Sequence, residues 1–297
     1  MRTVRTVAAL RAALEPHRAA GRSIGLVPTM GALHAGHLSL IQRARAHCDV
    51  VVVTLFVNPA QFNEHSDLER YPRDERHDAE LALAEGADLL FAPTVDEVYP
   101  PGFATAVEVL GLTDRLEGEA RGSEHFRGVT TVVTKLLCMC LPQVAYFGQK
   151  DAQQLIVIRR LVRDLNLPVR IESVPTVRDR DGLALSSRNA LLTSSERSRA
   201  LALPAALRTA EERVAAGERS AAALVRSAEA ELAALHVQPE YVALVDPDTL
   251  APIEALAGDC LLLLAARIGK VRLIDNVLLS AEKAASPLQP LPGKALA

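Results

Sequence analysis

Apolar positions in the first 175 residues alternate between two spacings, and this alternation predicts strands and helices in turn. Short, nearly continuous apolar runs, as in buried strands, occupy residues 23–29, 49–57, 87–93, 143–148 and 169–175. Apolar residues with helical spacing occupy the segments 6–20, 36–48, 73–86, 128–140 and 151–166. Strands that alternate with helices in this way predict a doubly wound, parallel, Rossmann-like sheet of the α/β class.

The pattern changes after Pro175. A strand-and-turn stretch at 176–192 leads to Thr193 and Glu196, whose spacing matches a capping box that opens an Ala-rich helical region. Pro204 is expected to delay or kink that region. Three strands are then predicted at residues 239–247, 259–267 and 270–279. We therefore expect a Rossmann-like domain at 1–175, a smaller α+β domain at 176–297, and a disordered tail from residue 286.

Composition and charge narrow the class of protein. The 297 residues are 49% hydrophobic and 23% charged, which is typical of globular chains, and the net charge is -3. The absence of a long basic run argues against nucleic-acid or membrane-surface binding. No leader-like or membrane-spanning run is present, so a cytoplasmic, reducing location is expected. The four cysteines are scattered, and for Cys138 and Cys140 buried free thiols are favoured over a metal or redox site.

The segment PTMGALHAGH carries the most distinctive chemistry. It follows the strand predicted at 23–29, and it places His34 and His37 three residues apart at the start of the next helix. A helix N-terminus offers unpaired N–H groups, and an imidazole can donate to a phosphate oxygen, so phosphate binding is the favoured function. A metal pair and a local capping or packing role are the two less favoured alternatives.

Three further loops carry polar residues after predicted strands or at the domain boundary. Ligands of doubly wound sheets lie beyond the carboxyl ends of strands, so we expect the loops FVNPAQFN and FGQKDAQQ to converge with PTMGALHAGH. Neutral amides can bind a hydroxyl or carboxylate, a lysine can reach a triphosphate, and hydroxyls with a guanidinium can close over phosphates. The alternative for FVNPAQFN is an ordinary Asn-Pro turn, and the alternative for FGQKDAQQ is that Asp151 is only an N-cap. These loops are FVNPAQFN with Asn58 and Gln61, FGQKDAQQ with Gly148, Lys150 and Asp151, and LALSSRN with Ser186, Ser187 and Arg188.

Taken together, PTMGALHAGH, FVNPAQF, YPRD, HFRGV, FGQKD and DGLALSSRN resemble the pantothenate synthetase (pantoate–β-alanine ligase) family of the nucleotidylyltransferase superfamily. The resemblance spans nearly the whole first domain and the start of the second. It implies formation of pantothenate from pantoate, β-alanine and ATP through a pantoyl-adenylate, with release of AMP and pyrophosphate. It also implies Mg²⁺ with ATP and a homodimer. By the same resemblance, the domain at 1–175 binds nucleotide and pantoate, and the smaller domain at 176–297 covers the active site.

The resemblance assigns roles residue by residue. Gln61 and Gln154 match the glutamines that hold pantoate, and we place Asn58 with them. Asp67 matches an acidic position near the metal and phosphates. His37, His34 and Lys150 are the expected catalytic residues. The expected ATP-binding residues are Met30, His34, His37, Gly148, Lys150, Asp151, Ser186, Ser187 and Arg188.

Three departures from the family pattern are visible. Gln149 stands where the family usually has Glu, Ser66 replaces a second acidic residue beside Asp67, and ARGSEHFRGV is one residue longer than usual. His125 still aligns, but Arg121 is left out of the site. Two rival functions are a nucleotidylyltransferase that uses a phosphate acceptor and a non-catalytic nucleotide-binding module. The neutral FVNPAQFN loop disfavours the first, and the second would have no need of both Gln61 and Gln154.

Overall fold

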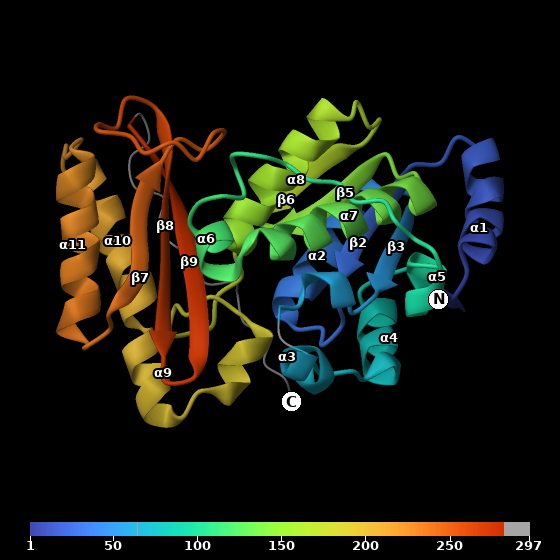
Figure 1. Ribbon diagram of the computed structural model, residues 1–297, viewed down its shortest axis with the longest axis horizontal. Helices are drawn as coiled ribbons and strands as arrows, with labels where there is room; N and C mark the ends of the chain where they lie inside the picture. The colour runs from blue at the N-terminus through green and yellow to red at the C-terminus, as the bar shows by residue number, and fades with distance from the viewer. Residues whose placement is uncertain (64, 282–297) are drawn as a thin grey trace. The chain divides into compact units, whose positions relative to one another are not determined.

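The computed structural model describes residues 1–63 and 65–281 (Figure 1). The chain forms two compact units. The first comprises Met1–Gly148 and Gln153–Val174, and the second comprises Gln149–Ala152 together with the chain from Pro175 onward. The turn at Gln149–Ala152 thus belongs with the second unit, although it lies within the first sequence segment. The tail expected from residue 286 lies outside the described residues.

The first unit is built on a parallel sheet. Within the described residues it has six strands in the order β1-β4-β3-β2-β5-β6, which confirms the doubly wound class. The order runs outward in both directions from β2 and β5, so the switch point lies between these two neighbours. The strands are β1 (Arg2–Val4), β2 (Ile24–Thr29), β3 (Val50–Leu55), β4 (Leu89–Phe91), β5 (Val144–Gly148) and β6 (Arg170–Val174).

Both faces of this sheet are covered because its central strands are apolar on both sides. Alternate residues such as Val27, Val51 and Tyr146 pack with α2 and α4 on one face. Helix α7 lies against β2, and α1 packs on α7. The helices of this part are α1 (Val7–Ala19), α2 (Ala35–His47), α3 (His65–Arg70), α4 (Glu75–Ala84), α5 (Val95–Val98), α6 (Glu117–Arg121), α7 (Ser123–Cys140) and α8 (Ala152–Asp164), with a 3₁₀ turn η1 (Pro59–Gln61).

The second unit pairs a small antiparallel sheet with helices, as expected. Strands β7 (Pro239–Val245), β8 (Asp259–Ile268) and β9 (Val271–Ser280) pair in sequence order. One face of β8 and β9 packs on α10 and α11 through residues such as Leu207, Leu224, Leu262 and Leu273. The helical elements are η2 (Gln149–Asp151), η3 (Ser187–Leu191), α9 (Ser194–Ala200), α10 (Ala202–Ala215) and α11 (Ala221–Ala234).

Several local predictions can be compared with the structure directly. The capping box of Thr193 and Glu196 is present at α9. The helical region breaks at Leu201, and Pro204 lies in the first turn of α10, where its missing N–H costs nothing. All four cysteines are free and Cys140 is buried, but Cys138 is exposed. The expectation that both thiols of this pair are buried is wrong, because residues two apart point to different sides of a helix.

Candidate active site

The loop between β2 and α2 is held by a carboxylate from α4. Asp78 is 3% exposed, and its oxygens accept hydrogen bonds from the backbone N–H groups of Ala32 (3.0 Å) and Leu33 (2.8 Å). Gly31 has a φ of +87°, and a Cβ there would lie 2.9 Å from an Asp78 oxygen. The loop therefore needs both glycine at 31 and an acceptor at 78. The acceptor role of Asp78 was not predicted from the sequence.

His34 and His37 form the start of α2. The His34 Nδ1 accepts from the N–H of Gly36 at 3.2 Å, and the His37 Nδ1 accepts from the N–H of His34 at 3.4 Å. The two ring centroids are 4.1 Å apart, and the ring planes are tilted by 38°. In each neutral ring the proton then sits on Nε2, because Nδ1 acts as an acceptor. The local capping role is thus present in the structure.

Asn58 and Gln61, in the loop after β3, form an amide pair beside Met30, in which Asn58 is buried and Gln61 half-buried. The Asn58 Nδ2 donates to the Gln61 Oε1 (3.0 Å) and to the Gly128 carbonyl (3.1 Å). The Gln61 Nε2 then faces the Met30 Sδ at 3.1 Å. A thioether is a weak acceptor, so the Gln61 N–H groups can pass to an oxygen of a ligand.

Asn58 itself is 1% exposed, and its Oδ1 accepts from the Tyr99 hydroxyl at 2.8 Å and from the N–H of Ala60 at 3.3 Å. Burial raises the pKa of Tyr99 to about 12, so the phenol keeps its proton and remains a donor. The amide of Asn58 is engaged on every side within the protein. In this structure Asn58 orients Gln61, and its direct contact with substrate stays a prediction.

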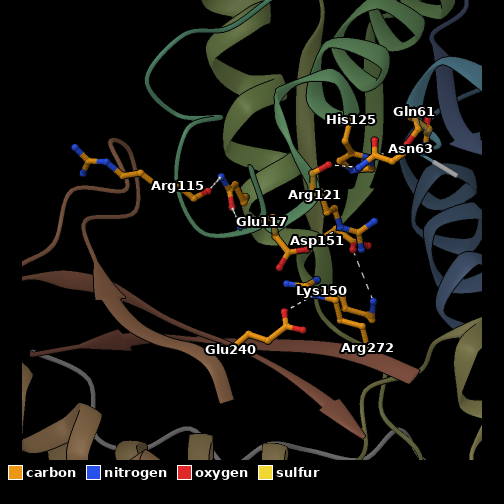
Figure 2. A network of polar contacts seen from close by, with 11 residues as sticks. Gln61, Asn63, Arg115, Glu117, Arg121, His125, Lys150, Asp151, Glu240 and Arg272 are labelled. Carbon is orange, nitrogen blue, oxygen red and sulfur yellow. Dashed lines mark hydrogen bonds and ion pairs between the residues drawn. The ribbon is translucent and has the colours of Figure 1, made fainter. Parts of the chain in front are cut away.

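Polar contacts also join the loop after β3 to α6 and α7 in the first unit (Figure 2). The His125 Nδ1 lies 2.8 Å from the Gln61 carbonyl oxygen, and Asn63 donates to the Arg121 carbonyl oxygen. The Arg121 guanidinium pairs with Glu117 at 3.0 Å, although the sequence reasoning left Arg121 out of the site. Gly128 lets η1 lie against α7, since a Cβ there would be 2.2 Å from the Ala60 oxygen.

The two glutamines that open α8 have different surroundings. Gln153 is 2% exposed, and it bonds the backbone at Leu112, Arg115 and Glu117. The neighbouring Gln154 is half-buried. Gln153 therefore anchors the segment before α6, which is compatible with Gln154 as the substrate-binding glutamine.

The second unit holds most of the other expected site residues. Lys150, with a side chain 19% exposed, lies in η2, and its Nζ is 3.7 Å from the Asp151 Oδ1 (Figure 2). Asp151 is the last residue of η2 and directly precedes α8, so its N-cap role stays a prediction. Ser186 caps η3 by accepting from the N–H of Arg188 at 3.3 Å, and Ser187 begins η3.

Gly148 belongs to the first unit, where it ends β5. Because β5 pairs in parallel with β2, the carboxyl ends of these two strands meet at one edge of the sheet. Met30 directly follows β2. The structure thus brings Gly148 to the edge that carries Met30.

The expected metal position is less completely described. Asp67 lies in α3, but the side chains at 65–67 fall outside the described residues. Elsewhere in the described chain, no group of three His, Cys, Asp or Glu side chains could hold a metal ion. No helix in the described chain combines the length and apolar character needed to cross a bilayer.

Comparison with known proteins decides the family. The family model described as pantoate–β-alanine ligase matches residues 2–278. This chain belongs to that family. It is 53% identical over 280 residues to the pantothenate synthetase of Moorella thermoacetica. The aligned residues make up 94% of this chain and 99% of that protein.

Solved structures of the pantoate–β-alanine ligase family agree with the fold. The crystal structure of pantothenate synthetase from Thermus thermophilus has a TM-score of 0.88 and 48% identity, covering 93% of this chain and 99% of that one. A pantoate–β-alanine ligase from Francisella tularensis, complexed with β-γ ATP and β-alanine, has a TM-score of 0.77 and 34% identity. It covers 96% of this chain and 100% of that one. The family resemblance drawn from the six sequence motifs is thereby confirmed.

Proposed function

We propose that this enzyme joins pantoate to β-alanine through a pantoyl-adenylate, consuming ATP and releasing AMP and pyrophosphate. A carboxylate does not react unaided with an amine, because oxide would have to leave. Attack of the pantoate carboxylate on the α-phosphorus of ATP breaks the bond to pyrophosphate and forms an acyl phosphate ester. The β-alanine amine then attacks the acyl carbon, the acyl–oxygen bond breaks, and AMP leaves with the electron pair. The amine proton goes to solvent or a base.

The observation that carries this proposal is the oriented amide of Gln61. Asn58 takes up its oxygen, so its N–H groups point at the weak acceptor Met30. Oxygens of pantoate are stronger acceptors than a thioether. Replacing the Met30 Sδ by a pantoate oxygen as the acceptor would therefore gain a hydrogen bond without moving the Gln61 amide. We place Gln61 and Gln154 at pantoate, with Asn58 acting through Gln61. Neutral amides suit a hydroxy acid better than a phosphate acceptor, which would favour Arg or Lys.

The charge that grows on the phosphates would be met by donors on several loops. The Nε2–H groups of His34 and His37, at the start of α2, would donate to the phosphates, and the helix dipole there also favours an anion. Lys150 would serve as a point charge. The remaining proposed ATP contacts come from Met30, Gly148, Asp151, Ser186, Ser187 and Arg188.

The proposal also includes Mg²⁺ with ATP, a homodimer and a cytoplasmic location. When bound, Mg²⁺ neutralises charge on the phosphates and on the departing pyrophosphate. Asp67 is the proposed protein ligand, with the other positions of the ion filled by phosphate oxygens and water.

Exchange of labelled pyrophosphate into ATP tests the adenylation step. With enzyme, Mg²⁺, ATP and pantoate, and without β-alanine, we expect label in ATP; omission of pantoate should stop it. His34→Ala and His37→Ala should each slow the exchange by about a hundredfold, the typical loss when one preorganised donor is removed. Exchange that survives both substitutions in folded protein would refute the histidine roles. Pantothenate synthesis without any pantoate-dependent exchange would refute a reversible adenylate.

A further inference from the structure

The side chain of Asn276 in β9 holds the turn that carries Lys150. Asn276 is 4% exposed, and its Nδ2 donates to the carbonyl oxygens of Gln149 and Lys150, both at 2.9 Å. These two residues are 127 and 126 positions away in the sequence. One buried amide therefore fixes two consecutive peptide units of η2.

The orientation of this amide follows from its partners. Backbone carbonyls only accept hydrogen bonds, so the NH₂ group has to face them, and a flipped amide would set its own oxygen against both carbonyl oxygens. The Asn276 Oδ1 is buried and has no hydrogen-bond partner among the described residues. A buried polar atom without a partner is costly. The amide thus makes its two donor contacts while its oxygen stays without a partner among the described residues.

The neighbouring residue fixes Asn276 in turn. Successive residues of a strand face opposite sides, so Asp275 lies on the face of β9 that packs on the helices, together with Leu273 and Val277. Asp275 forms two hydrogen bonds with Arg178, at 2.6 and 2.9 Å, with side chains 1% and 5% exposed. The Asp275 Oδ1 also accepts from the N–H of Asn276 at 2.8 Å. The backbone at 275–276 is thus held on the side opposite the η2 contacts.

We propose that Asn276 is a positioning residue for Lys150. Clamping the two carbonyls restricts the φ and ψ angles of η2, and so it sets the point from which the lysine side chain extends. This inference rests on the proposed role of Lys150 at the ATP phosphates. Displacing a charge stabiliser by about 1 Å can cost about a hundredfold in rate. Loss of the clamp should therefore act on turnover through Lys150 rather than on pantoate binding.

A double-mutant cycle separates this role from a general structural one. Asn276→Ala should lower kcat by at least about tenfold, within the range for a misplaced catalytic group, with KM for pantoate nearly unchanged. In a Lys150→Ala background the same substitution should cost less than about twofold, because residues that act as a unit are not additive. Asn276→Asp keeps the side-chain volume but sets an acceptor against the two carbonyls, so it should show the same loss of kcat. It provides the test if Asn276→Ala folds poorly.

Ser227→Ala is the matched control. Its buried hydroxyl also donates to a backbone carbonyl of the second unit, that of Leu224 at 2.7 Å, but in α11. It should lower the unfolding midpoint and leave kcat unchanged. If Lys150→Ala alone has normal turnover, the proposed role of Lys150 fails. If Lys150→Ala is impaired but both Asn276 variants turn over normally, or cost the same in both backgrounds, the positioning role of Asn276 is overturned.

Discussion

The substitution Asp78→Asn tests whether a carboxylate from α4 shapes the loop that carries His34 and His37. Asp78 is buried, and each of its oxygens accepts one backbone N–H, from Leu33 at 2.8 Å and from Ala32 at 3.0 Å. Asparagine has the same shape but only one acceptor oxygen, so one N–H would face an NH₂ group. Hydrogen bonds to a charged group are worth about 1.5–3 kcal/mol, and a buried unpaired donor costs about 1–3 kcal/mol.

Because these terms overlap, we expect Asp78→Asn to lower the free energy of unfolding by about 2–4 kcal/mol. Urea denaturation gives this value, and Asp96→Asn, at an exposed position of α5, is the control, expected to stay within about 0.5 kcal/mol. Pyrophosphate exchange should fall as well, since the same loop leads into the His34 cap. An Asp78→Asn protein with unchanged stability and unchanged exchange would contradict the reasoning.

Three further outcomes are expected. Gln61→Ala should raise KM for pantoate by about tenfold or more while leaving ATP affinity nearly unchanged, because a ligand oxygen loses its donor; an equal loss for ATP in steady-state kinetics would move Gln61 out of the pantoate pocket. Burial raises the pKa of Cys140 from 9.0 to about 12. Above pH 9 the thiol therefore ionises in the unfolded protein but stays protonated in the folded protein. The free energy of unfolding should fall as pH rises towards 12. Denaturation at several pH values should show a shallower fall for Cys140→Ala, by up to about 1.4 kcal/mol per pH unit, and identical slopes would count against this cause. Gln149→Glu, which restores the usual family residue, should keep near-normal turnover in an assay of pantothenate formation from pantoate, β-alanine and ATP. A severe loss would mean that η2 in this protein differs from η2 in the rest of the family.

The longer elements of the fold could be predicted because their signals are local. Each strand predicted from an apolar run is present, and the helices at α1, α2, α4, α7 and α8 follow their apolar spacing. The edge strand β1 and the short helices α3, α5 and α6 were missed. Segments of three to six residues have too few positions to show a period, and tertiary contacts fix them. The N–H of Val7, for example, donates to Glu97 of α5 at 2.8 Å.

The type of each main element, the order of the loops and the residue types at the expected site could be predicted from local sequence, because backbone period and turn chemistry depend on near neighbours. The distant side chains that hold those loops become visible only in the folded protein. Asp78 reaches Leu33 across 45 positions, and Asn276 reaches Lys150 across 126. No local pattern marks an Asp in α4 or an Asn in β9 as an anchor, since their partners are backbone groups, which every residue carries. These contacts exist only once the packing of sheet and helices has brought the segments together.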